Sequence, residues 1–101
     1  PELAAIYGRL TGGDQTARIA RAEAWLRQHP DDGVLLMALG RMCQRQRLWG
    51  KAQSYLEASI AVRPSVAAHL ELAEMLEQHG RHDQASPHFK ACLKLALHAR
   101  Q

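Results

Sequence analysis

Six histidines and two cysteines are the side chains of this chain that could hold a metal ion or a haem group. Imidazole and thiolate are common ligands of transition metals, and two ligands on one helix share an ion when they lie four residues apart. No two histidines have that spacing, and His79 and His82 stand on either side of Gly80. We therefore expect no metal and no cofactor, and we expect Cys43 and Cys92 to pack as small hydrophobic residues.

The chain contains no motif that is typical of an enzyme. It has neither the glycine-rich loop of a nucleotide site nor the HExxH pattern of a zinc protease. Glu71, Glu74 and Glu77 follow at three-residue intervals, which is typical of a solvated or groove-lining helix face. We expect Trp25 to pack in a core and Trp49 to wedge between helices, instead of stacking on a ligand. The sequence therefore predicts a protein that is not an enzyme.

Composition and charge narrow the class of protein. Apolar residues make up 47% of the chain and charged residues 23%, as in a globular domain. The net charge is +3, and ten of the thirteen basic residues are Arg, which favours recognition of carboxylates or phosphates. Because no aromatic residues alternate with the basic ones, we do not expect nucleic-acid binding. The chain starts at Pro1 without Met, so we expect it to be part of a longer protein, and it has no apolar run of the roughly 18 residues that span a bilayer.

The chain contains an internal repeat. Residues of one copy match residues of the next copy at the offset that separates Leu39 from Leu72, which is the repeat offset. The matching positions are all apolar or small: Leu39 with Leu72, Gly40 with Ala73, Cys43 with Leu76, Ala52 with Ala85, Leu56 with Phe89, Ser59 with Cys92 and Ile60 with Leu93. A weaker copy precedes them. In the middle copy, residues 34–46 and 51–63 have the apolar spacing of helices, and Pro64 ends the second one. Each copy therefore predicts two antiparallel helices.

Three such helix pairs, about residues 1–32, 33–65 and 66–99, predict a single all-α domain over residues 1–101. Gly40 and Ala52 are small, so we expect the two helices of one pair to cross there. We expect Leu39, Leu56 and Ile60 to fill the space between one pair and the next. A single pair cannot bury its apolar face, so each repeat needs a neighbour.

The spacing resembles the tetratricopeptide repeat, W-x2-L-G-x2-Y…A-x3-F…P. The middle copy matches at Leu36, Leu39, Gly40, Cys43, Ala52, Leu56 and Pro64, and the last copy at His69, Leu72, Ala73, Leu76, Ala85 and Phe89, with Leu97 at the proline position. Leu36 and His69 replace the opening aromatic residue, and Pro87 lies inside a predicted helix. The resemblance implies a right-handed superhelix of three antiparallel helix pairs, an α-solenoid, in which His69 packs in the aromatic position.

In such a superhelix the first helix of each pair lines a concave groove that commonly holds a peptide. The residues that the resemblance places in this groove are Tyr7, Met37, Arg41, Gln44, Arg45, Leu70, Glu74 and Glu77, together with Leu3 and Leu10. We expect Arg41 and Arg45 to bind carboxylates of a protein or peptide partner. The alternative is that these arginines pair with Glu74 or Glu77 of the next repeat, or are solvated.

A closer resemblance is carried by the strings IYGRL (6–10), ARAEAWLRQHPDD (20–32), LGRMCQRQRLWGKAQSYLEASI (39–60) and AEMLEQHG (73–80). They are similar to the C-terminal region of bacterial HemY-type proteins. This resemblance implies a bacterial inner-membrane protein, anchored by membrane helices that are not in this chain, with the present domain on the cytoplasmic side. It also implies a setting near haem and porphyrin biosynthesis, with an enzyme of that pathway as the partner, and it implies no mechanism.

Two other functions stay open. The last predicted helix is apolar on several sides, at Ala91, Leu93, Leu95, Ala96 and Leu97, whereas the end of a repeat array should be polar outside. That helix could therefore join copies of the chain into an oligomer. A tetrapyrrole-binding domain is the third alternative, and it would show a Soret shift that one particular His or Cys substitution abolishes.

Overall fold

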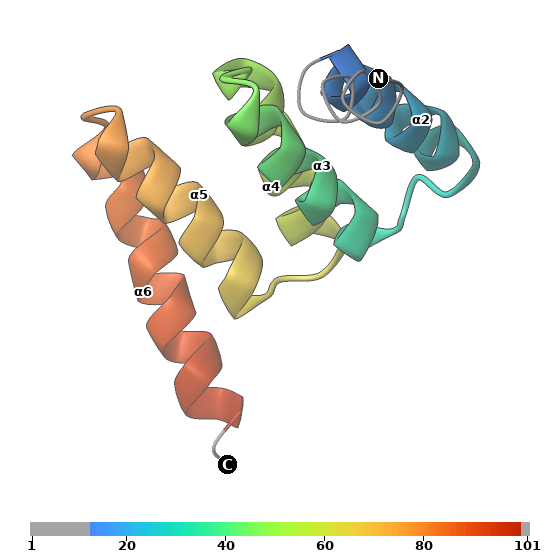
Figure 1. The fold of residues 1–101 in the computed structure, drawn as a ribbon. Helices are drawn as coiled ribbons and strands as arrows, with labels where there is room; N and C mark the ends of the chain where they lie inside the picture. The colour runs from blue at the N-terminus through green and yellow to red at the C-terminus, as the bar shows by residue number, and fades with distance from the viewer. Residues whose placement is uncertain (1–12, 100–101) are drawn as a thin grey trace, which may run out of the picture.

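The computed structural model describes residues 13–99, and within this range the chain is helical and has no strand (Figure 1). The helices are α2 (Gly13–Gln28), α3 (Gly33–Arg45), α4 (Trp49–Val62), α5 (Val66–Gln78) and α6 (His82–Ala99). The predicted all-α class is confirmed. The first predicted helix, with Tyr7, Leu3 and Leu10, lies outside the described residues. No helix in residues 13–99 combines the length and the hydropathy that a bilayer crossing requires.

The helices pack in the order in which they follow one another along the chain. α3 and α4 form one antiparallel hairpin, and α5 and α6 form a second (Figure 1). α2 packs against α3, and α4 packs against α5. The hairpins are therefore arranged side by side, and α4 contacts both α3 and α5.

The two hairpins begin with the same helix cap. Asp32 and Ser65, which are equivalent positions of the repeat, have extended backbones directly before α3 and α5. The Asp32 carboxylate accepts a hydrogen bond from the Leu35 N–H at 3.0 Å, and the Ser65 hydroxyl accepts one from the Ala68 N–H at 3.1 Å. Each side chain thereby satisfies one of the N–H groups that a helix start leaves without a partner.

The first helices of the two hairpins also end in the same way. Arg47 and Gly80, which are again equivalent positions of the repeat, have left-handed backbones with φ of 59° and 75°. The next residue in each hairpin donates its N–H to a carbonyl of the preceding helical turn, Leu48 to Cys43 and Arg81 to Leu76, both at 2.8 Å. This is the Schellman motif, which reverses the chain after a helix. The repeat in the sequence is thus a repeat of backbone conformation.

The core is tightest where α3 crosses α4. A Cβ atom on Gly40 would lie 2.7 Å from Leu56 Cγ and 2.8 Å from Leu56 Cδ2, and 3.4 Å from the Ala52 carbonyl oxygen. Leu39, Ala52 and Leu56 are completely buried. The predicted crossing at Gly40 and Ala52 is confirmed, but Leu56 packs against Gly40 inside its own hairpin, and not only between hairpins as we expected.

A polar network joins α2 to α4. The Glu23 carboxylate accepts a hydrogen bond from the Tyr55 hydroxyl and lies 2.9 Å from Lys51 Nζ. These two donors lower the pKa of Glu23. Burial, reinforced by the bond to Glu23, raises the pKa of Tyr55. The network therefore holds the carboxylate in its charged form and the phenol in its neutral form, each matched to the other.

We expect Gly40→Ala to lower the free energy of unfolding by about 1 kcal/mol or more. The added methyl group would overlap Leu56, which is buried and cannot move aside, and overpacking costs about 1–3 kcal/mol, more than the roughly 1 kcal/mol that alanine contributes to a helix. Gly50→Ala is the control, because a Cβ at Gly50 meets nothing within 4 Å and should stabilise α4 by about 0.5 kcal/mol. Urea unfolding followed by circular dichroism measures both changes, and stabilisation by both would contradict the close crossing.

We expect Arg47→Gly to raise the free energy of unfolding by about 0.5–1 kcal/mol, since the left-handed backbone costs an L-residue about 1–2 kcal/mol. Gly80→Ala, at the equivalent position, should lower the same free energy by about 1 kcal/mol. Opposite signs in thermal unfolding support the shared cap. Equal signs would mean that the two turns differ in solution.

Candidate binding surface

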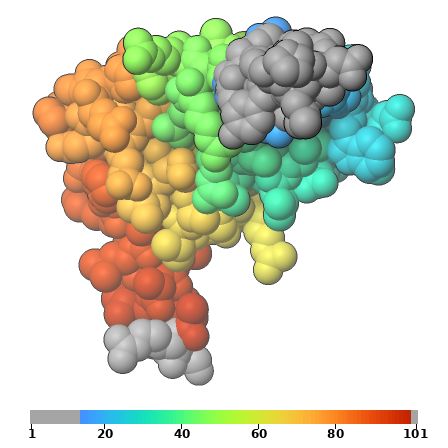
Figure 2. All heavy atoms as spheres, in the orientation of Figure 1, coloured from blue at the N-terminus to red at the C-terminus, as the bar shows by residue number. Residues whose placement is uncertain are grey.

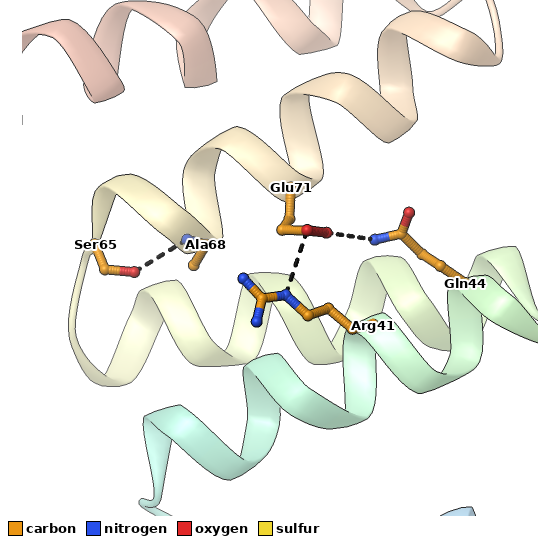
Figure 3. A network of polar contacts seen from close by, with 5 residues as sticks. All are labelled: Arg41, Gln44, Ser65, Ala68 and Glu71. Atoms are coloured by element: carbon orange, nitrogen blue, oxygen red, sulfur yellow. Dashed lines mark hydrogen bonds and ion pairs between the residues drawn. The ribbon is translucent and has the colours of Figure 1, made fainter. Parts of the chain in front are cut away.

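Arg41 and Gln44 of α3 meet Glu71 of α5 in a polar cluster between the two hairpins (Figure 3). Arg41 Nε donates to Glu71 Oε1 at 3.3 Å, and Gln44 Nε2 donates to Glu71 Oε2 at 3.2 Å. The Arg41 and Glu71 side chains are 42% and 31% exposed. Two helices from different repeats therefore present one carboxylate and its two donors at a partly solvated surface.

The cluster borders a hollow of about 250 Å³ that is lined by Arg41, Gln44, Arg45 and Glu71. Arg45 is exposed, and within residues 13–99 it makes no ion pair. Arg41 uses Nε for Glu71, so its two Nη groups make no hydrogen bond to another described residue. A guanidinium has five N–H donors and pairs best with a carboxylate through two of them. The hollow is therefore supplied with unused donors of the kind that bind carboxylates.

The structure brings together only part of the predicted groove. Met37, Arg41, Gln44 and Arg45 follow one another along one side of α3, and Met37 is half-buried against the core. Glu71, which we assigned to a solvated or groove-lining face, is the residue that pairs with Arg41. The expected alternative partners, Glu74 and Glu77, make no ion pair with an arginine within residues 13–99.

The acidic half of the predicted groove is exposed on α5. Leu70 is 40% exposed, and Glu74 is exposed as well. Glu77 instead pairs with His82, whose Nδ1 lies 2.7 Å from Glu77 Oε1. On both helices an apolar residue precedes a charged one by about one turn, Met37 before Arg41 on α3 and Leu70 before Glu74 on α5, and Glu71 follows Leu70 directly. The surface thus changes from apolar to charged along the direction of these helices.

Two of the histidines, His69 and His88, contact each other between α5 and α6. His69 is buried, as predicted, and its Nδ1 lies 2.9 Å from Nδ1 of His88 across the α5–α6 interface. Burial and then the neighbouring His88 lower the pKa of His69. The spacing rule for one helix did not find this pair, because the two residues come from different helices. No group of three or more His, Cys, Asp or Glu side chains among residues 13–99 could hold a metal ion.

The two tryptophans behave differently. Trp49 packs between α4 and α5, as expected, with its ring centre 4.4 Å from that of His79. The prediction for Trp25 was wrong, because its side chain is 56% exposed and its ring lies against His29 of the same helix end, with 4.7 Å between the ring centres. The buried stripe of α2 runs along Ile19, Ala22 and Leu26, which leaves Trp25 outside it.

The two cysteines differ in burial. Cys43 is completely buried, as predicted. Cys92 is only half-buried, and its Sγ lies 3.6 Å from the carbonyl oxygen of Val66. Burial raises the pKa of both thiols, which keeps them in the unreactive protonated form.

Comparisons with known proteins do not assign a family to this chain. Neither a scan against protein-family models nor a search of curated proteins finds a match. The functional inference therefore depends on the geometry of the chain, above all on the repeated hairpins and on the cluster around Glu71.

We expect the free energy of unfolding to fall as the pH is lowered from 7.5 to 5.5, because the pKa of His69 is lower in the folded chain than in the unfolded one. Folding favours the neutral form of His69. The stability that this form contributes is complete above the unfolded pKa, and it is lost as the pH falls from the unfolded pKa through the folded pKa. His69→Gln should reduce this pH dependence while still bonding His88. Denaturant unfolding at both pH values measures the effect, and an unchanged pH dependence in the variant would contradict it.

Proposed function

We propose that this chain is a non-catalytic interaction module that binds a carboxylate-bearing segment of a protein partner at the hollow between α3 and α5. The observation that carries the proposal is the cluster in which Glu71 engages only one of the donors of Arg41, while Arg45 stands beside it without an ion-pair partner among residues 13–99. The one carboxylate of the cluster, that of Glu71, is already bound by Arg41 and Gln44, and these two side chains are donors that recognise carboxylates. These contacts favour binding over catalysis.

We further propose that the helices form a right-handed superhelix of tetratricopeptide type. Support comes from two hollows at equivalent junctions, one between α2 and α3 and one between α4 and α5. Their linings correspond at the repeat offset or one position from it, Gln15 with Trp49, Ile19 with Gln53, Met42 with Met75 and Gln46 with His79. α2 would then be the second helix of a first pair, and α3 and α5 would line the concave side.

The apolar residues Met37 and Leu70 indicate a second property of the partner segment. Met37 lies about one turn before Arg41 on α3, and Leu70 directly precedes Glu71 on α5. A bound segment with an apolar side chain at one end and a carboxylate at the other would match both halves. Such a segment would gain orientation from the carboxylate and affinity from apolar burial.

The setting of this activity is a proposal that rests on the HemY resemblance. The partner would be an enzyme of haem or porphyrin biosynthesis, and the module would work on the cytoplasmic side of a bacterial inner membrane. The membrane attachment would come from segments outside this chain.

We expect a dye-labelled peptide of Leu, Ala and Glu residues to bind the chain at least tenfold more tightly than the same peptide with Gln in place of Glu. Arg45→Glu should weaken binding of the acidic peptide about tenfold, since a charge-assisted contact contributes about 1.5–3 kcal/mol. Fluorescence anisotropy at low salt measures these affinities. Equal affinity for the two peptides would contradict carboxylate recognition.

Two matched variants separate this site from net charge. Arg21→Glu makes the same charge change as Arg45→Glu on an exposed residue of α2 that lines neither the hollow around Glu71 nor the one beside Met37, and it should leave the affinity nearly unchanged. Glu71→Gln should strengthen binding severalfold, because it removes the carboxylate that competes for Arg41. Glu57→Gln, on α4, is the control for that change in charge. If each variant and its control have the same effect, the binding is a property of the overall charge.

A further inference from the structure

An apolar stripe on α6 is left uncovered by the other described helices. Phe89, Leu93 and Leu97 follow at four-residue intervals and are 39%, 62% and 50% exposed. Among residues 13–99, α6 packs extensively only against α5. Its C-terminal half projects beyond the rest of the molecule (Figure 2). Three large apolar side chains in a row on one helix form a contiguous patch, whereas single exposed apolar side chains are ordinary on a protein surface.

The preceding hairpin shows how such a stripe is covered. At the repeat offset, Phe89 corresponds to Leu56 and Leu93 to Ile60 of α4. Leu56 is completely buried, and Ile60 is packed against the core. The difference arises because α4 has a helix on both sides, α3 and α5, whereas α6 has α5 on one side. The exposed stripe is thus the equivalent of a surface that is buried one repeat earlier.

The contacts of α4 identify the helix that covers it. Trp49 and Gln53 extend the Leu56–Ile60 stripe towards the start of α4, and both meet the end of α5. The ring of Trp49 packs on His79, and Gln53 accepts a long hydrogen bond from Arg81 at 3.5 Å. The α4 stripe therefore lies between two helices, because Leu56 packs on Gly40 of α3 and the residues before it meet the end of α5. On α6, α5 takes the place of α3, and no described helix takes the place of α5.

The charged residues beside the α6 stripe indicate which kind of helix could bind there. α5 carries three glutamates and neither Lys nor Arg. α6 carries Lys90 and Lys94, both exposed, and its single acidic residue, Asp83, is in the first turn. Lys90 and Lys94 precede Leu93 and Leu97 by three residues, so they border the stripe. Two copies of α6 packed on each other would place these lysines close together, which is unfavourable, whereas an acidic helix would pair with them.

We propose that the α6 stripe, Phe89, Leu93 and Leu97 with Lys90 and Lys94, binds an acidic amphipathic helix of a partner protein in the way that α4 binds α5. This surface shares no residue with the hollow around Glu71, so the chain has two separate binding surfaces. The helix in the partner has apolar residues at three- or four-residue intervals, flanked by carboxylates that reach the two lysines.

A peptide with the sequence of residues 65–81 is the probe, because it contains α5 together with the residues that cap it at both ends. Adding it to the isotope-labelled full chain should shift the amide resonances of residues 86–97. Leu93→Gln should weaken this binding about tenfold by removing one apolar contact. The peptide with Gln in place of its three glutamates should bind severalfold more weakly at low salt.

Val34→Gln is the matched control, because Val34 is 75% exposed on α3, away from α6, and the variant should bind the peptide as the wild-type chain does. Leu93 and Val34 are both exposed, so circular dichroism should show the same helix content for all three proteins. Three results would overturn the proposal. They are the absence of shifts, shifts confined to α4 because the peptide displaces α5, and sedimentation showing a dimer that Leu93→Gln dissociates, which would make a second copy the occupant.

Discussion

The close approach of α3 and α4 at Gly40 determines the shape of the first complete hairpin. Leu56 fills the space that a side chain at position 40 would need. In the second hairpin Ala73, which is completely buried, takes the place of Gly40. Phe89, the counterpart of Leu56, lies partly outside the core at 39% exposure. The stripe that is buried on α4 is thus exposed on α6, where no second described helix packs extensively against it.

The hairpins are alike at their ends and different on their surfaces. Asp32 and Ser65 start them, and Arg47 and Gly80 turn them, through the same hydrogen bonds. These groups are satisfied within each hairpin, so the residues between them are free to vary as long as the apolar stripe is kept. The polar cluster around Glu71 arises from that freedom, because its members come from equivalent helices that carry different side chains.

The helices, the repeat and the crossing at Gly40 could be predicted from the sequence. Apolar spacing and small residues specify structure within one or two helical turns, and such local patterns can be recognised in a sequence. Most contacts between hairpins could not be predicted, although Trp49 was expected to pack there. Arg41 reaches Glu71 and not Glu74 or Glu77, and this choice depends on the rotation and offset of α5 relative to α3. His69 and His88 meet across an interface for the same reason. The prediction for Trp25 was wrong because the first copy matches the repeat weakly, so the sequence does not define the buried stripe of that helix.

The Arg41–Glu71 ion pair spans two hairpins, and this has a mechanical consequence. Helices that contact their chain neighbours form a stack whose curvature depends on the angle at each junction. The ion pair lies across such a junction on the side where α3 and α5 approach each other. In the proposed complex, a carboxylate that competes for Arg41 would loosen this brace, and one that bridges α3 and α5 would replace it. Binding at the hollow and the angle between the two hairpins would then be thermodynamically coupled, and each would affect the other to the same degree.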